Sequence, residues 1–355
     1  MARTLTTLET TLSQIAAPDQ ACAEAAQRIF DFKTKPRGSL GRLEELVCRV
    51  AAIRRQPRPA PEPAAIVVVA ADHGIAIEGV SAYPQEVTSQ MLANFAGGGA
   101  AICVLARAAG ARLVVVDAGV GQPFTHTAVL DRRLGPGTAN ASLGPAMTRA
   151  QALRGLEHGI GLAEELAAQG IGVIALGDMG IGNTAISGTI AAALLGRNPG
   201  EVLGRGTGID DEGFRRKVAT VRRALEANAP DPSDPVGVLA AVGGFEHAVL
   251  AGVALGAAAA HVPVVLDGFV VGAAALIAAR IAPLASAAMI ASHRSTEPGH
   301  AVVLEALGLD PLLDLRMRLG EGSGAALGLQ LIQDALLLFR DMSTFEGAGV
   351  TDAGA

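Results

Sequence analysis

The feature that most constrains the fold is an alternation of short apolar runs with longer segments of helical pattern. Runs rich in β-branched residues predict buried strands at 65–70, 113–116, 171–176, 263–266 and 287–291. Helical spacing of apolar residues lies between them, for example at 149–169, 211–228 and 245–260. Strands that are apolar throughout and separated by helices are typical of a parallel sheet buried on both faces. The sequence therefore predicts an α/β fold with a Rossmann-like, three-layer arrangement.

Polar side chains follow each predicted strand at the point where it ends. They are Asp72 with His73, Asp117, Asp178, Asp267, and Ser292 with His293. A single aspartate in such a place is often only a helix cap. Ligands of open α/β sheets, however, bind beyond the carboxyl ends of the strands. Five such ends together favour a ligand site at this edge of the sheet.

The two ends of the chain carry helical patterns without strands. Residues 1–55 have three such patterns, and residues 323–342 read as one strongly apolar helix. The proline-rich segment 56–63 is typical of a linker. We therefore predict a small helical bundle domain from residues 1–55 and 323–346, beside a large α/β catalytic domain at 64–322. Residues 347–355 are predicted to form a frayed tail.

Composition excludes several classes of protein. The net charge of −6 gives no basic surplus for neutralising nucleic-acid phosphates. The three cysteines show no CxxC spacing, which argues against a disulfide framework or a zinc site. We interpret them as buried thiols of a reducing compartment, and the N-terminus has no apolar signal segment, so a cytoplasmic location is expected.

The most apolar stretch, residues 248–283, requires a test against a membrane span. His261, Pro263 and Asp267 interrupt it near its middle. A spanning helix needs about 20 uninterrupted apolar residues. The stretch is therefore interpreted as helix, strand and helix of a protein core, and no membrane partner is expected.

The segment LGDMGIGNT, residues 176–184, is the strongest local motif. A strand ends there, glycines form a tight loop, and a helix begins near Asn183 or Thr184. Amide groups at a helix start attract anions, and glycines let a phosphate approach closely. The spacing matches neither a P-loop nor a dinucleotide fingerprint. The alternative is a plain strand–helix connection capped by Asn183.

Lys217 follows a second glycine loop, residues 204–213. It is one of only three lysines in a chain that otherwise uses arginine. A retained lysine suggests a need for a compact ammonium charge, as beside an anion. The alternative is an ordinary solvated lysine on a helix.

Glu321 lies between two glycines in the segment RLGEGSGA, residues 318–325. Partial burial there would raise its pKa toward neutrality, which suits a general base. The alternative is an acid that caps the final helix. Tyr83, the sole tyrosine, is a candidate platform for a flat ligand.

Asp72 and His73 are adjacent after the first strand and leave two interpretations open. They are either an acid–base or metal-ligand pair, or a structural hydrogen-bonded pair. A magnesium-dependent phosphohydrolase is a related alternative, in which Asp72, Asp117, Asp178 and Asp267 hold the ion. The remaining histidines show no metal-binding spacing, and His247 is interpreted as a core or surface residue.

Six motifs occur in order along the chain. They are ADHGIAIEGVSAYPQEVT at 71–88, LGDMGIGNT at 176–184, GRGTGIDDEG at 204–213, VVLDGFV at 264–270, SHRSTEPGH at 292–300 and RLGEGSGA at 318–325. Together they resemble the nicotinate-nucleotide–dimethylbenzimidazole phosphoribosyltransferase family of cobalamin lower-ligand assembly. The resemblance runs from Lys35 almost to the C-terminus.

The resemblance implies a reaction and a set of roles. The ribosyl phosphate of nicotinate mononucleotide passes to 5,6-dimethylbenzimidazole, giving α-ribazole 5′-phosphate and nicotinate. Glu321 is the implied general base. The implied phosphate and ribose residues are Asp178, Gly180, Gly182, Asn183, Thr184, Gly206, Thr207, Lys217, Asp267 and Ser295. The implied base-binding residues are Tyr83, Pro84, Gln85, Met317 and Leu319.

The resemblance also implies a homodimer that uses no metal and no cofactor. Asp178 departs from the pattern, because other members have glutamate there. Two alternatives stay open: a related phosphoribosyltransferase that uses another azole or a purine, and a non-catalytic protein that binds a nucleotide or an azole. Apolar base pockets discriminate weakly, since one methylene is worth only about 1–3 kcal/mol.

Overall fold

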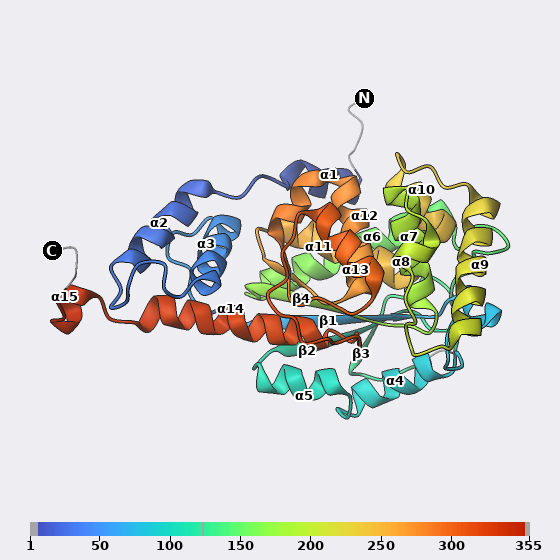
Figure 1. Cartoon of the computed structure of the whole chain (residues 1–355), viewed down its shortest axis with the longest axis horizontal. Coiled ribbons are helices and arrows are strands. Elements are labelled where there is room, and N and C mark those ends of the chain that lie inside the picture. The colour runs from blue at the N-terminus through green and yellow to red at the C-terminus, as the bar shows by residue number, and fades with distance from the viewer. Residues whose placement is uncertain (1–5, 123, 352–355) are drawn as a thin grey trace.

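A computed structural model describes residues 6–122 and 124–351. Its core is a six-stranded sheet in which all neighbouring strands run parallel (Figure 1). The strands are β1 (Ala64–Ala71), β2 (Arg112–Gly119), β3 (Val129–Asp131), β4 (Val173–Met179), β5 (Val264–Leu266) and β6 (Met289–Ala291). Their order is β3-β2-β1-β4-β5-β6, so the direction of winding reverses between β1 and β4. This is the doubly wound topology, which confirms the predicted α/β fold.

The five predicted strands are all present in the sheet. The sixth, β3, was not predicted, because it is three residues long and only half-buried or exposed. It is defined by its pairing with Val115–Asp117 of β2. A local sequence pattern does not predict such a pairing. A short edge strand of this kind depends on its neighbour rather than on its own sequence.

Alternate residues of β1 divide the core into two halves. Ala65, Val67 and Val69 face one hydrophobic cluster, whereas Ile66 and Val68 face the other. All are fully buried, as expected for a central strand of a parallel sheet.

Helices cover both faces of the sheet, as Figure 1 shows. The first cluster joins β1 to helices α6 (Arg149–Ala168), α7 (Asn183–Leu195), α11 (Phe245–Ala259), α12 (Phe269–Ile281) and α13 (Pro298–Leu307). The second joins it to α4 (Val87–Ala96), α5 (Ala101–Ala108) and α14 (Ser323–Asp341). The first cluster also contains residues of α8 (Pro199–Val202), α9 (Asp211–Asn228), α10 (Pro235–Val242), η1 (Gly74–Glu78) and η2 (Pro283–Ala288).

The apolar stretch 248–283 folds as expected into α11, β5 and α12, and nearly all of it is buried. Among the described residues, one stretch, 87–108, is long and apolar enough to span a membrane by length and composition alone. It consists of two helices, α4 and α5. Their side chains Leu92, Phe95 and Ile102 are buried in the second core cluster.

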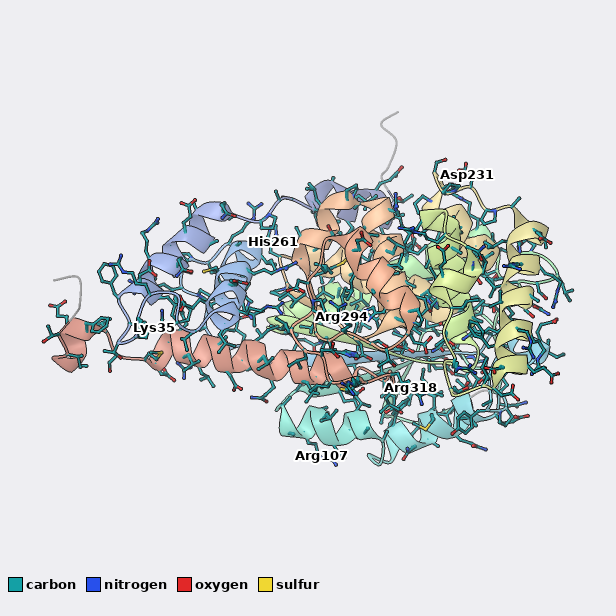
Figure 2. All side chains as sticks on the ribbon, in the orientation of Figure 1. Lys35, Arg107, Asp231, His261, Arg294 and Arg318 are labelled. Atoms are coloured by element: carbon teal, nitrogen blue, oxygen red, sulfur yellow. The ribbon has the colours of Figure 1, made fainter. Side chains whose placement is uncertain are left out.

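Helices from both ends of the chain form a bundle beside the sheet. α2 (Gln20–Asp31) and α3 (Arg42–Arg54) pack together and against α14, with the rings of Phe30 and Phe339 centred 5.0 Å apart. The same bundle contains a buried ion pair, in which Lys35 Nζ lies 2.7 Å from Glu44 Oε1. Figure 2 shows that Lys35 lies far from the sheet.

The bounds predicted for the small domain do not coincide with this packing. α1 (Thr7–Gln14) lies against α6 and α11, and the first turns of α14 lie against β4 and β5. The predicted tail begins inside α15 (Phe345–Ala348), and residues 352–355 lie outside the described residues. The three thiols are free, but only Cys103 is buried, so the expectation for Cys22 and Cys48 was wrong.

Candidate active site

A cavity of about 750 Å³ opens beyond the carboxyl ends of β4, β5 and β6. Loops and helix starts that follow these strands surround it, together with the start of α4 and the segment before α14. Ten of the predicted residues line it: Tyr83, Asp178, Gly180, Asn183, Thr184, Gly206, Thr207, Ser295, Leu319 and Glu321. The others, Pro84, Gln85, Gly182, Lys217, Asp267 and Met317, do not.

The loop between β4 and α7 forms one wall of the cavity. A Cβ on Gly180 would lie 2.4 Å from the carbonyl oxygen of Ala71, so only glycine fits there. Gly182 has φ 97° and is the N-cap of α7, which has no side-chain cap. Asn183 is therefore not the cap; its Nδ2 donates to Asp178 Oδ2 at 2.8 Å. A helix start without a side-chain cap at a cavity wall is suited to an anion.

Lys217 stands directly behind this wall. Its side chain is fully buried, so the interpretation as a solvated lysine was wrong. Nζ donates to Thr184 Oγ1 at 2.9 Å and to the carbonyl oxygen of Gly204 at 3.1 Å. Burial lowers the pKa of Lys217 to about 8, against the opposing effect of Glu297. Glu297 Oε1 accepts the amide of Gly206 at 2.9 Å.

Glu321 also lines the cavity and is only 7% exposed. Burial raises the pKa of this carboxyl, and the negative charge of Asp267 raises it further, whereas the amide of Ile102 lowers it. Its Oε2 has no hydrogen-bond partner within the part of the chain that the structure describes. α14 begins only at Ser323 with Gly322 as N-cap, so Glu321 does not cap it. A buried carboxyl oxygen that has no partner among the described residues therefore belongs to a residue of the cavity wall.

Asp178 brings a second carboxyl to the cavity, at the end of β4. Burial raises its pKa well above the usual range, and the charges of Asp267, Glu246 and Glu321 add to the effect. Its backbone carbonyl accepts the amide of Glu321 at 3.3 Å. The site thus holds two neighbouring carboxyls whose pKa values are both raised by burial.

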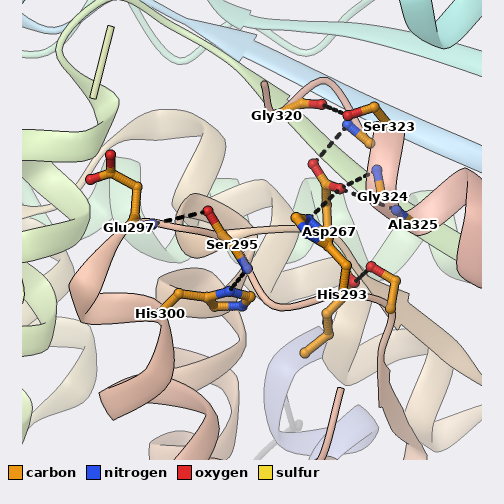
Figure 3. Close-up of polar contacts among 12 residues, drawn as sticks. Asp267, His293, Ser295, Glu297, His300, Gly320, Ser323, Gly324 and Ala325 are labelled. Atoms are coloured by element: carbon orange, nitrogen blue, oxygen red, sulfur yellow. Dashed lines mark hydrogen bonds and ion pairs between the residues drawn. The ribbon is translucent and has the colours of Figure 1, made fainter. Parts of the chain in front are cut away.

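Asp267, for which the resemblance implies a phosphate or ribose contact, does not line the cavity. Its carboxylate is fully buried and accepts backbone amides at the start of α14 rather than facing the cavity (Figure 3). Ser295 does line the cavity; its amide donates to His300 Nδ1 at 2.9 Å, and its Oγ accepts the amide of Glu297 at 3.3 Å.

Apolar side chains form the remaining side of the cavity. Tyr83 and Leu319 are 56% and 57% exposed at its mouth, with Val87 and Met91 on α4 beside them. Sequence reasoning missed Val87, Met91, Met179, Phe269 and Glu297, and it named His293 only as a strand-end residue. The i, i+4 spacing of Val87 and Met91 was a signal that could have marked one helix face. This half of the cavity suits a flat, apolar ring.

The aspartates proposed to hold magnesium have separate partners. Asp72 Oδ2 accepts the amide of Gly121 at 2.7 Å, and Asp117 pairs with Arg133 at 2.8 Å. In the described chain, no group of three or more acidic, histidine or cysteine side chains is arranged to hold a metal ion. The shared magnesium site is therefore wrong for these four residues.

His73 pairs with Glu246 instead of Asp72. Its Nε2 lies 3.0 Å from Glu246 Oε1, and His247 Nδ1 lies 2.8 Å from the same oxygen. His247 Nε2 is 2.9 Å from Ser187 Oγ, which donates to the carbonyl oxygen of Asn183. The positive charge of the histidines holds the pKa of Glu246 far below its usual range despite complete burial. This buried network of side chains packs against the glycine loop between β4 and α7, where His73 lies next to Gly180 and Gly182.

Comparisons with known proteins agree over nearly the whole length. A family model described as phosphoribosyltransferase matches residues 15–350. A nicotinate-nucleotide–dimethylbenzimidazole phosphoribosyltransferase from Roseiflexus castenholzii is 54% identical; the match covers 97% of this chain and 98% of that enzyme. An enzyme of the same name from Desulforamulus reducens is 50% identical, and the match covers 98% of this chain and 99% of that enzyme. The crystal structure of the Thermus thermophilus enzyme of that name is 46% identical, covers 94% of this chain and 100% of its own, and superposes with a TM-score of 0.88.

Proposed function

The chain belongs to the nicotinate-nucleotide–dimethylbenzimidazole phosphoribosyltransferase family, and from this premise we propose how its residues carry out the reaction. The ribosyl 5′-phosphate of nicotinate mononucleotide passes to 5,6-dimethylbenzimidazole. The products are α-ribazole 5′-phosphate and nicotinate.

Glu321 is the general base of this transfer. One benzimidazole nitrogen attacks C1′ of the ribose, and the bond between C1′ and the pyridinium nitrogen breaks. Nicotinate leaves with that electron pair as a neutral nitrogen heterocycle, so its departure needs no general acid. The proton on the other benzimidazole nitrogen passes to Glu321 and later to solvent.

The observation that carries this proposal is the state of the Glu321 carboxyl. It is buried at the cavity wall, one oxygen has no partner among the described residues, and burial raises its pKa. A carboxyl with these properties is a stronger base than an exposed glutamate.

The 5′-phosphate lies against the start of α7. Gly180, Gly182, Asn183 and Thr184 surround it, and Lys217 supplies positive charge from behind Thr184. Gly206, Thr207 and Ser295 close the anion pocket, while Asp178 faces the ribose. We thus assign the phosphate to the start of α7 and the reacting ring nitrogens to the neighbourhood of Glu321.

The benzimidazole ring lies at the apolar end, between Tyr83 and Leu319. Pro84, Gln85 and Met317 support this end from outside the cavity lining. Attack then comes from the face of the ribose opposite to the leaving nicotinate. The configuration at C1′ inverts from β to α.

The working form of the protein is a cytoplasmic homodimer that needs neither metal nor cofactor. Residues 64–322 supply the catalytic unit, and α2 and α3 form a smaller unit beside it with the later part of α14. Neither nucleic acid nor membrane is a partner; the negative net charge and the absence of a basic surplus support the first of these statements.

The test is a product analysis. Wild type and Glu321→Gln are mixed with nicotinate mononucleotide and dimethylbenzimidazole, with and without EDTA, and the products are separated by chromatography. We expect α-ribazole 5′-phosphate from wild type in both conditions and a rate at least about 100-fold lower from the variant, since a positioned base contributes 10²–10⁴-fold. No ribazole phosphate from wild type, or an unimpaired variant, would refute the proposal. Competing purines and azoles in the same assay test the alternative acceptors.

A further inference from the structure

The backbone that carries Glu321 is held in an unfavourable conformation. Glu321 has φ 63°, and its neighbours Gly320 and Gly322 have φ 84° and 86°. Glycine adopts this left-handed region freely, but a residue with a Cβ does not. A non-glycine residue persists there only when its surroundings over-determine it. Contacts of the segment around Glu321 must therefore hold it in this conformation.

Asp267 is the group that meets this segment on its far side. Its Oδ2 accepts the amide of Gly322 at 3.0 Å, and its Oδ1 accepts the amides of Gly324 at 2.7 Å and Ala325 at 3.1 Å (Figure 3). These bonds begin one residue after Glu321. A single carboxylate thus fixes the chain from the catalytic glutamate into the first turn of α14.

Asp267 is itself held by the sheet and by complete burial. It follows directly after β5, whose last residue, Leu266, accepts the amide and the hydroxyl of Ser292 at 3.1 and 2.6 Å. Its side chain is fully buried, and His293 Nε2 lies 3.5 Å from its Oδ1. The sheet therefore provides a rigid platform for the segment that bears Glu321.

We propose that Asp267 is a positioning residue that sets the place and the basicity of Glu321, and not a residue that binds the substrate. The proposal rests on the proposed role of Glu321 as the base. It differs from the family resemblance, which implied a phosphate or ribose contact for Asp267.

The same contacts influence the charge of Glu321. Amides at a helix start stabilise nearby anions. Asp267 occupies those of Gly322, Gly324 and Ala325, so they are not available to Glu321. The charge of Asp267 also raises the pKa of Glu321, in the same direction as burial does. Both effects make Glu321 a stronger base.

The first test is kinetic and uses Asp267→Asn. An asparagine has the same size, but only its single carbonyl oxygen can accept the three amides. We expect kcat to fall about 10- to 100-fold, as for a catalytic group displaced by about 1 Å. The KM for nicotinate mononucleotide should change by less than about threefold, because the substrate does not touch Asp267. A large rise in KM with little change in kcat would overturn the proposal.

The second readout is the pH profile of kcat/KM. The titratable groups that face Asp267 are Glu321, Asp178 on β4 and His293 after β6. Loss of the Asp267 charge lowers the pKa of Glu321, so the acidic limb of the profile moves to lower pH in Asp267→Asn. An acidic limb that stays in place or moves upward contradicts the proposal.

A double-variant comparison separates this inference from the proposed function. If Asp267 acts through Glu321, then Asp267→Asn has no further effect on the residual rate of Glu321→Gln. Multiplicative effects would show an independent role and overturn the inference. If Glu321→Gln alone retains full activity, the proposed function itself fails, whatever Asp267 does.

Asp117→Asn is the matched control. Asp117 also ends a strand and accepts two backbone amides, those of Gly119 at 2.9 Å and Val120 at 2.8 Å, but it does not line the cavity. Its substitution should leave the pH profile unchanged. If Asp267→Asn does not fold, Asp267→Glu retains the charge and is judged by the same comparison of kcat with KM.

Discussion

Gly177, near the end of β4, is a position at which one added methyl group directly perturbs the backbone of Glu321, the proposed base. A Cβ built there would lie 2.4 Å from the amide nitrogen of Gly322 and 2.5 Å from the carbonyl carbon of Glu321. Ordinary contacts of a Cβ begin at 3.4 Å, so these atoms must separate by about 1.0 Å. The atoms concerned are backbone, which no side-chain rotation can move aside.

Gly177→Ala therefore displaces the peptide that follows Glu321 by roughly the distance that costs 10²-fold in rate. That factor corresponds to about 2.7 kcal/mol in the activation barrier. Overpacking of a buried site also costs about 1–3 kcal/mol of stability. The phosphate end of the cavity is not in this contact, so the affinity for nicotinate mononucleotide should be nearly retained.

The assay measures kcat and KM at saturating dimethylbenzimidazole, alongside urea denaturation. Gly161→Ala is the control, because a Cβ there meets no atom within 4 Å inside α6. That variant should keep its activity and gain up to about 1 kcal/mol of stability. A Gly177→Ala enzyme with wild-type kcat would refute the idea that this close approach sets the position of Glu321.

Two further predictions concern the buried charges. Lys217→Met should raise the KM for nicotinate mononucleotide about 10- to 100-fold, because a charge-assisted hydrogen bond contributes about 1.5–3 kcal/mol. Since the pKa of Lys217 is about 8, kcat/KM of wild type should fall as the pH rises above that value, and the variant should lose this limb. Glu246→Gln should destabilise the fold by about 3–5 kcal/mol in urea denaturation, because it leaves His73 and His247 without their shared carboxylate. Because the folded pKa of Glu246 lies below its usual value, this contribution is present above about pH 4.5 and lost as the pH falls further, so the deficit of the variant should shrink in acid. A deficit that grows in acid, or a Lys217→Met enzyme with wild-type KM, would contradict these assignments.

Local pattern was enough to predict the layers of the fold and the edge of the sheet that carries the site. The β-branched runs that became β1, β2 and β4 are buried on both faces, and such strands leave a clear signature. β3 left none, because its three residues are defined by pairing with β2. The sequence also did not predict that α1 packs on α6 and α11, because an amphipathic pattern does not specify which element a helix packs against.

Pairing over long distances explains what the sequence did not reveal about the site. The strand-end motifs identified His73 and Asp267 but not their partners, Glu246 and the amides at the start of α14. Their partners lie far along the chain, and only the doubly wound topology brings them together. Lys217 shows the opposite case, because its rarity in an arginine-rich chain was a compositional clue to a buried charge.

The most direct test of Glu321 as the base separates chemistry from binding. Single-turnover rates are measured with enzyme in excess over nicotinate mononucleotide and saturating dimethylbenzimidazole, for wild type and Glu321→Gln, and calorimetry gives the affinity for the nucleotide. The account predicts a variant that binds nicotinate mononucleotide as wild type does but turns over at least about 100-fold more slowly. A variant that turns over at the wild-type rate, or one that is slow only because it no longer binds the nucleotide, would contradict it.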